Sequence, residues 1–368
     1  MKSVLFLIPT LGGGGAEKVL VNLANNLDKE KYDVTVQTLF KGGVHTGKLK
    51  EHVKYITGKT KPFRGNVQLF KLFSPSFLYR HIVKKRYDIV VAYLEGVVCR
   101  IVAGCPYEDS KKLAWIHSAQ KTEKTAKYSF RSTQEMQTLY NRFDKIVCVA
   151  ETVKEDFKKL VRPQKECAVL YNVNETDEIK RLAEEDESAK YSSAPTLISV
   201  GRLIPVKGFD RLIRLHKRLL DEGVENRLQF LGDGRLRGEL EQQIENLGVK
   251  DSVSLLGFQS NPYPYVKNAD LFVCSSISEG FSTAVTEALV VGTPVVSTDV
   301  SGAYELLGKN NEYGIVVKQD EEALFAAVKR LLTEDGLLAQ YKVQAEKRGQ
   351  EFSKEKTVQA VEELFENI

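Results

Sequence analysis

The sequence predicts an α/β protein made of two parallel-sheet units in series. Short apolar runs, each long enough for a buried strand, alternate with longer segments of helical periodicity. Glycine-containing loops follow several of these runs, as they do in doubly wound sheets. The alternation stops in a polar segment after Asn172 and then begins again, and 368 residues are enough for two domains with separate cores.

The first half begins with a predicted strand at Val4–Ile8, the glycine loop Gly12–Gly15 and a helix over 16–27 whose leucines share one face. A helix is expected before each of the fifth and sixth strands. We assign residues 1–172 to the first domain. Its further predicted strands are Val34–Leu39, Val53–Ile56, Ile89–Ala92, Leu113–Ile116, Ile146–Val149 and Cys167–Leu170.

Residues 173–195 are rich in Glu, Asp, Ser and Ala, and we interpret them as a linker region with room for one short helix. The second domain is expected over 196–352, followed by a terminal segment, 353–368. Its predicted strands are Leu197–Val200, Leu228–Leu231, Val253–Leu256, Leu271–Cys274, Val295–Ser297 and Ile315–Val317. The predicted helices are Phe209–Leu220, Arg235–Leu247, Thr283–Val291, Glu321–Leu332 and Lys354–Phe365.

The composition, 42% hydrophobic and 28% charged, is ordinary for a soluble globular protein. The start of the chain has no signal-peptide pattern, and charges or proline interrupt the most apolar segments, Ile89–Cys105 and Ala284–Val300. We therefore expect no transmembrane helix. The five cysteines have no C-x-x-C spacing, which favours reduced thiols in a cytosolic protein.

The net charge of +4 conceals an asymmetry between the two halves. Residues 1–172 hold 30 basic and 16 acidic side chains, whereas the remainder holds 23 and 33. Many of the basic residues lie in Lys48–Arg86 and Lys121–Arg142, among Phe and Tyr side chains. This mixture suits an anionic membrane surface. A solvated face is the alternative, and nucleic acid would use the same charges, but no nucleic-acid-binding module is evident.

One strand–loop–helix stretch, 270–298, carries two acidic residues that need an explanation. Glu279 lies in the loop after Leu271–Cys274, and Glu287 lies within a very apolar helix that Ser282 or Thr283 can cap. A carboxylate in such surroundings requires hydrogen-bonding partners. Either an internal donor or a bound ligand satisfies Glu287.

Two loops at strand ends suit phosphate groups. Gly12–Gly15 precedes a helix, whose free N–H groups attract anions, although the loop can also be a mobile turn. Arg202 and Lys207 lie in the loop after the first strand of the second domain, where open α/β sheets bind ligands. Arginine binds phosphate oxygens in pairs and lysine adds a point charge. Two solvated surface cations are the alternative.

Other candidates also follow strands. Gly232 and Gly257-Phe258 leave room at the same sheet edge, and we expect Asp233 to cap the next helix. His117 either faces a ligand or is structural, and Glu95 either binds an acceptor hydroxyl or forms a surface salt bridge. No Asp-x-Asp or His/Cys spacing indicates a metal site.

Together these motifs resemble glycosyltransferase family 4 (GT4), retaining enzymes of the GT-B fold, of the bacterial capsule and cell-surface polysaccharide type. Glu279-Gly280-Phe281…Glu287 is similar to the family's Glu-x7-Glu motif, followed by Gly292-Thr293-Pro294. The loop with Arg202 and Lys207 is similar to its phosphate-binding segment, and Gly12–Gly15 to its N-terminal glycine loop. The resemblance covers essentially the whole chain. It implies two Rossmann-like doubly wound domains facing a cleft, with the last helix crossing back to the first domain.

The resemblance also implies roles for individual residues. Arg202 and Lys207 would hold the diphosphate of a nucleotide-sugar, and Glu279 the donor sugar. Glu287 would bind the ribose, and His117 would contact the sugar near its 6-hydroxyl. Glu95 would bind the acceptor. Further donor-binding positions would be Gly13, Gly14, Gly15, Gly232, Gly257, Phe258, Gly280, Phe281, Ser282 and Thr283. Many relatives have Gly-Leu-Pro where this chain has Ser282-Thr283-Ala284, so the sugar contacts of this loop can differ.

The expected function is therefore transfer of a sugar from a nucleotide-sugar, by default a UDP-sugar, to a lipid-linked or cell-surface polysaccharide acceptor. Retention of configuration and independence of metal are implied, and no cofactor is expected because the nucleotide-sugar is a co-substrate. The expected location is cytoplasmic, peripheral on the inner face of the membrane. A non-catalytic GT-B protein that binds a partner enzyme or a sugar is the alternative. A sugar-nucleotide epimerase would need more acid/base groups, and a nicotinamide dehydrogenase would need G-x-G-x-x-G.

Overall fold

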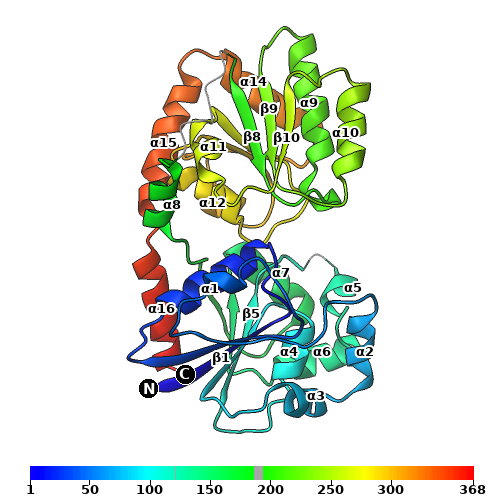
Figure 1. Cartoon of the computed structure of the whole chain (residues 1–368), viewed down its shortest axis with the longest axis vertical. Coiled ribbons are helices and arrows are strands. Elements are labelled where there is room, and N and C mark those ends of the chain that lie inside the picture. Colours follow the sequence, from blue (N-terminus) through cyan, green and yellow to red (C-terminus); the bar gives the residue numbers. More distant parts are fainter. Residues whose placement is uncertain (121, 186–193) are drawn as a thin grey trace. The chain divides into compact units, whose positions relative to one another are not determined.

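The computed structural model describes residues 1–120, 122–185 and 194–368, which form two compact units (Figure 1). Unit 1 consists of Met1–Val173 together with Lys354–Ile368, and unit 2 consists of Asn174–Ser353. Part of the expected linker, 186–193, lies outside the described residues. Its helix α8 (Thr176–Ala183) packs within unit 2 against α11 (Tyr263–Asn268) and α12 (Thr283–Val290).

Unit 1 contains a seven-stranded sheet in the order β3-β2-β1-β4-β5-β6-β7, and every neighbouring pair is parallel. The strands are β1 (Lys2–Ile8), β2 (Tyr32–Thr38), β3 (Lys54–Ile56), β4 (Ile89–Tyr93), β5 (Lys111–Ile116), β6 (Lys145–Cys148) and β7 (Cys167–Val169). The helices are α1 (Gly15–Asn26), η1 (Thr46–Lys48), α2 (Asn66–Leu72), α3 (Pro75–Ile82), α4 (Val97–Val102), α5 (Glu123–Ala126), α6 (Thr133–Tyr140), α7 (Glu151–Val161) and α16 (Lys354–Glu366).

Unit 2 contains a six-stranded sheet in the order β10-β9-β8-β11-β12-β13, again parallel throughout. The strands are β8 (Thr196–Val200), β9 (Arg227–Leu231), β10 (Val253–Gly257), β11 (Leu271–Cys274), β12 (Val295–Thr298) and β13 (Ile315–Val317). Besides α8, α11 and α12, the helices are η2 (Pro205–Lys207), α9 (Phe209–Asp221), α10 (Arg237–Asn246), α13 (Ala303–Leu307), α14 (Glu321–Thr333) and α15 (Leu337–Glu351).

The predicted strands form because their apolar runs are buried on both faces of the sheets. The side chains of Val4–Ile8 are completely buried, as are those of most of β4 and β11. Helices cover both faces of each sheet (Figure 1), so a strand interior has no solvated side, as expected for parallel sheets. The prediction of two doubly wound parallel sheets is confirmed.

The final helix, α16, belongs to unit 1, where Figure 1 shows it in red beside the blue N-terminal elements. The ring of Phe365 lies 5.7 Å from that of Tyr32 and 6.3 Å from that of Phe6, between ring centroids. The Lys2 ammonium donates to the Phe365 carbonyl at 2.7 Å. Unit 1 is therefore built from two segments that unit 2 separates in sequence.

Unit 2 differs from the sequence prediction at Asp233 and in three helices that were not predicted, α11, α13 and α15. Asp233 is not the helix cap, because α10 begins only at Arg237 and the Asp233 carboxylate accepts from the Gly234 amide instead. The intervening loop is held by the Leu203 backbone, which bonds to Asp233 and Leu236. Helix α15 was not predicted because few of its residues are apolar. It packs on α12 at Gly349, where a Cβ would lie 2.1 Å from the Leu289 carbonyl oxygen.

All five cysteines are free thiols. Among the helices of the described residues, none has both the length and the hydrophobicity that crossing a bilayer requires.

Candidate functional site

The strand order brings the candidate residues together in each unit. In unit 2 the neighbouring strands β8 and β11 mark the point where the order reverses, and the loops after them carry Lys207 and Glu279. In unit 1 the equivalent pair is β1 and β4, followed by the glycine loop and Glu95. Ligands of open α/β sheets bind beyond the carboxyl ends of strands at this reversal.

At the reversal in unit 2, an ion pair joins two predicted site residues. The Lys207 ammonium donates to a Glu279 oxygen at 2.6 Å, and the Ser276 hydroxyl donates to the same oxygen at 2.6 Å. The two charged side chains are only 19% and 15% exposed. A cation and a carboxylate are therefore held as a pair at the place where a ligand is expected.

The loops that carry this pair are also hydrogen-bonded to each other. The Ser275 hydroxyl donates to the carbonyls of Lys207 and Gly208 at 2.8 and 3.0 Å. The Ile277 amide donates to Val206 at 2.7 Å. These hydrogen bonds hold the two loops together and so place Lys207 opposite Glu279.

Arg211, on the first turn of α9, supports the same loops and was missed by sequence reasoning. Its guanidinium donates to the Ser275 carbonyl, while its Nε is buried with no hydrogen-bond partner in the described part of the chain. Gly208 lies against both groups: a Cβ there would be 2.5 Å from the Ser275 oxygen. An arginine three residues after a glycine at a strand–helix junction is the sequence signal that could have found it.

Arg202 and Glu287 lie on either side of this pair in sequence but differ in exposure. Arg202 is exposed, and no hydrogen bond or ion pair within the described residues holds its guanidinium. Glu287 is buried in α12, among apolar neighbours as expected. Ser282 caps that helix by accepting from the Val285 amide.

Among the glycines predicted to line the donor site, Gly232 serves close backbone packing. A Cβ on Gly232, whose φ is 131°, would lie 2.0 Å from the Gly201 carbonyl oxygen. Gly257 also has a positive φ, 73°, and Phe258 beside it is exposed. Gly302 packs against the Gly280 carbonyl and the Phe281 ring, since a Cβ on Gly302 would lie 3.1 and 2.8 Å from them. Thr283 is half-buried on the first turn of α12.

In unit 1, Glu95 forms no ion pair within the described residues, so the salt-bridge alternative is wrong. Its carboxylate accepts from the His117 amide at 2.9 Å and from the Ser118 hydroxyl. The backbone of this loop is strained at Leu94, whose φ is 148°, whereas glycine adopts the φ of 93° found at Gly96 without strain. Glu95 thus fixes the chain just after β5.

The His117 imidazole is a buried ring. Its centroid lies 4.5 Å from that of Tyr93 and 6.5 Å from that of Trp115. The ring Nε2 is buried with no hydrogen-bond partner in the described chain. Burial lowers the pKa of His117 to about 3. The ring is therefore neutral at physiological pH and offers one unpaired nitrogen.

We expect His117 to weaken the fold as the pH falls. The unfolded chain takes up a proton at His117 below about pH 6.5, whereas the folded chain does so only near pH 3. The free energy of unfolding of the native protein should therefore decline through this interval relative to that of His117→Phe. Urea unfolding at several pH values measures the difference, and a difference independent of pH would contradict the prediction.

The glycine loop precedes α1, with Gly14 as its N-cap. A Cβ on Gly14 would lie 2.2 Å from a carboxylate oxygen of Glu17, so this carboxylate folds back over the helix N-terminus. His45, also missed by sequence reasoning, lies beside the loop and donates from its amide to Leu11 at 3.2 Å. Burial and the nearby Lys48 and Lys18 lower its pKa to about 4.

Among the described residues, no group of three or more His, Cys, Asp or Glu side chains is arranged to hold a metal ion.

Two protein-family models match consecutive parts of the chain. Residues 13–178 match Glycosyltransferase Family 4, and residues 180–348 match Glycosyl transferases group 1. The chain therefore belongs to the family 4-type glycosyltransferases, as the motifs at the strand ends predicted.

Two relatives come from Campylobacter jejuni. N-acetylgalactosamine-N,N'-diacetylbacillosaminyl-diphospho-undecaprenol 4-alpha-N-acetylgalactosaminyltransferase is 38% identical over 194 residues, 52% of this chain and about half (51%) of that protein. GalNAc-alpha-(1->4)-GalNAc-alpha-(1->3)-diNAcBac-PP-undecaprenol alpha-1,4-N-acetyl-D-galactosaminyltransferase is 26% identical over 342 residues, 91% of this chain and 90% of that protein.

Among solved structures, HepE from Anabaena in complex with UDP and glucose is similar over 100% of both chains, with a TM-score of 0.78 and 20% identity. This likeness confirms the GT-B fold class.

Proposed function

We propose that this protein transfers a sugar from a UDP-sugar to a lipid-linked saccharide, with retention of anomeric configuration and without a divalent metal ion. The observation that carries the proposal is the Lys207–Glu279 pair, made by two loops at the strand-order reversal of unit 2. Arg202 lies exposed in the same loop as Lys207. The site thus has cations for a diphosphate and a carboxylate for a sugar.

The chemistry follows from where charge develops. As the bond between the anomeric carbon and the β-phosphate oxygen breaks, negative charge collects on the departing nucleotide. Arg202 and Lys207 stabilise that charge electrostatically. The Lys207 ammonium, which pairs with Glu279 in the structure, contacts phosphate in the donor complex, and Glu279 binds the hydroxyls of the donor sugar.

The other residues position the donor. The amides of Gly280, Phe281 and Ser282 hold the sugar with Glu279, and Glu287 binds the ribose hydroxyls. The acceptor hydroxyl attacks from the face that the nucleotide leaves. Its proton passes to a phosphate oxygen of the departing UDP, so retention needs no protein nucleophile.

Unit 1 supplies the acceptor side. The glycine loop meets phosphate, and the unpaired Nε2 of His117 accepts from or donates to a sugar hydroxyl. The Glu95 carboxylate orients the chain at His117 by accepting from the His117 amide, and it binds the acceptor. The Campylobacter relatives, whose names include diphospho-undecaprenol and PP-undecaprenol, support a lipid-linked acceptor, and the HepE complex with UDP supports the nucleotide. We also propose that the basic unit 1 binds an anionic membrane surface on its cytoplasmic side and that the protein needs no cofactor.

A screen of UDP-, GDP- and ADP-sugars by thermal unfolding tests the donor. A UDP-sugar at about 100 times its Kd should stabilise the fold by about 2.7 kcal/mol. Transfer to a synthetic lipid-linked saccharide should persist in a chelator, and proton NMR of the product should show the anomeric configuration of the donor. Stabilisation without transfer or nucleotide release would favour the non-catalytic alternative.

A further inference from the structure

A segment of unit 1 without acidic residues carries a fixed apolar surface. Residues 52–87 contain nine Lys or Arg and no Asp or Glu, and they include α2 and α3. Several large apolar side chains of this segment are exposed, with Leu72 at 74% and Phe77 at 43%. We call this the α2–α3 face; its exposed apolar residues are Phe63, Leu69, Leu72, Phe73 and Phe77.

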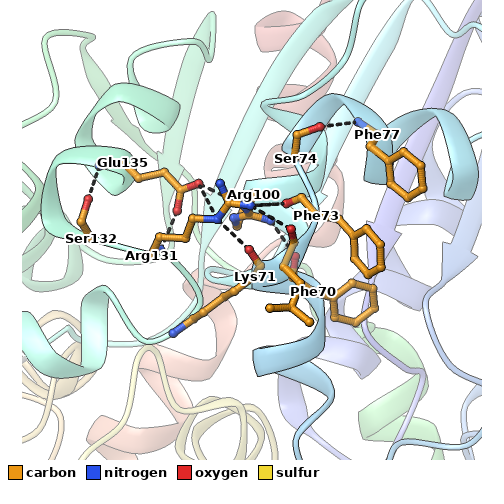
Figure 2. A network of polar contacts seen from close by, with 10 residues as sticks. Phe70, Lys71, Phe73, Ser74, Phe77, Arg100, Arg131, Ser132 and Glu135 are labelled. Atoms are coloured by element: carbon orange, nitrogen blue, oxygen red, sulfur yellow. Dashed lines mark hydrogen bonds and ion pairs between the residues drawn. The ribbon is translucent and has the colours of Figure 1, made fainter.

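Buried and half-buried arginines hold the end of α2, as Figure 2 shows. The Arg100 guanidinium, completely buried, donates to the carbonyls of Phe70 and Phe73 at 2.9 Å each. Arg131 donates to the carbonyls of Lys71, Leu72 and Phe73 at 2.6 to 3.1 Å. The last carbonyls of a helix are normally satisfied by water or a cap. Here guanidinium groups from outside the helix satisfy the carbonyls of Phe70, Lys71 and Leu72.

One carboxylate connects the two arginines. Glu135 accepts from Arg100 at 3.0 Å through one oxygen and from the Arg131 amide at 2.5 Å through the other. Ser132, the cap of α6, in turn accepts from the Glu135 amide at 3.0 Å (Figure 2). The end of α2 is thus fixed to α4 and α6, and its exposed side chains cannot retract by a rearrangement of this turn.

The chemistry of the α2–α3 face indicates what covers it. The rings of Phe73 and Phe77 stack at 5.1 Å, so they present one flat apolar surface. Arg64, Arg80, Lys84 and Lys85 are exposed in the same segment, which has no acidic side chain to neutralise them. An exposed apolar cluster surrounded by cations is complementary to a bilayer with anionic headgroups.

We propose that the α2–α3 face docks on an anionic lipid surface and that Arg100 and Arg131 are positioning residues that hold it in the docking conformation. The inference rests on the proposed function, since a lipid-linked acceptor places the reaction at a membrane. It also connects the surface with the site: the Arg100 amide bonds to the Gly96 carbonyl, directly after Glu95. Docking of this face would therefore fix the distance of Glu95 and His117 from the membrane surface.

Flotation of the full chain with vesicles tests the surface. Binding is expected to phosphatidylcholine vesicles that contain phosphatidylglycerol, to weaken with salt, and to be lost with phosphatidylcholine alone. Leu72→Glu and Phe77→Glu should each weaken binding about tenfold or more, because an apolar contact becomes a like-charge repulsion. Val343→Glu, at a 62% exposed residue of unit 2, is the matched control and should bind like the native protein.

Arg131→Gln tests the positioning role. The Arg131 side chain is half exposed, and its substitution removes the guanidinium contacts to α2 while Arg100 stays in place. Weaker vesicle binding with unchanged thermal unfolding supports the proposal. Native binding by this variant overturns the positioning role, and native binding by Leu72→Glu overturns the docking surface. RNA binding is measured as well. If the native protein binds an RNA oligonucleotide, and Leu72→Glu abolishes that binding as fully as it abolishes vesicle binding, the lipid assignment is overturned. UDP-sugar stabilisation is measured without vesicles, so its failure would reject the donor site and leave the docking result standing.

Discussion

Lys207→Met is expected to lower kcat at least about 100-fold, the scale on which enzymes lose activity when one group that stabilises an oxyanion is removed. Methionine keeps the apolar stem of the side chain and removes the charge. The departing diphosphate then lacks one of its two cations, while Arg202 still binds the ground state. KM for the UDP-sugar should therefore change less than kcat, and steady-state kinetics with the lipid-linked acceptor separates the two.

The same substitution leaves Glu279 without its cation, so stability must be measured beside activity. The Ser276 hydroxyl still donates to Glu279, which limits the loss. The double variant Lys207→Met, Glu279→Gln removes both charges and should recover most of the thermal stability without recovering activity. Lys217→Met, which breaks an ion pair with Asp221 on the surface of α9, is the matched control and should change neither. Near-native kcat for Lys207→Met would reject the proposed phosphate contact.

Gly232→Ala is expected to destabilise unit 2 by roughly 3 kcal/mol or more, among the largest effects of a single methyl group. The new Cβ would lie 2.0 Å from the Gly201 carbonyl oxygen at a φ of 131°, so it must push apart the loops after β8 and β9. Because Arg202 follows Gly201 directly, KM for the donor should rise as well. Urea unfolding and donor kinetics report the two effects.

Alanine substitutions at two other glycines show how much of this loss of stability comes from backbone strain and how much from the steric collision. Gly223 has φ 76° with open space around it, so Gly223→Ala shows the cost of strain alone, about 1 kcal/mol. Gly238 lies inside α10 with no neighbour near its Cβ position, and Gly238→Ala should stabilise by about 0.5–1 kcal/mol. If Gly232→Ala cost no more than Gly223→Ala, the close approach of the two loops would not matter to folding.

The sheets could be predicted from the sequence because parallel strands are apolar throughout, and runs such as Val4–Ile8 are distinctive. Helix α15 could not, because its contact with α12 depends on the absence of a side chain at Gly349 and not on an apolar stripe. The Asp233 cap was wrong for a similar reason. The sequence shows a helix former after a strand, but the Leu203 backbone that delays the helix comes from another loop.

The candidate site, like the fold, could be predicted from the sequence only in part. Each charged residue could be placed at a strand end, but the pairing of Lys207 with Glu279 depends on β8 and β11 being neighbours. Arg100 was not singled out because nothing local distinguishes a buried arginine from a solvated one. Arg211 was not singled out either, although it follows Gly208 by three residues. Their partners are carbonyls of loops and of a helix end that lie far from them in the chain.

The division of unit 1 into two segments, separated in sequence by unit 2, affects how the protein folds during synthesis. During synthesis the Phe6 and Tyr32 rings emerge from the ribosome long before Phe365, which packs against both. Unit 2 is continuous in sequence and can complete its core first, reversing the usual order in which N-terminal domains fold ahead of later ones. Loss of the chain beyond Ser353 would therefore leave unit 2 whole and unit 1 without α16.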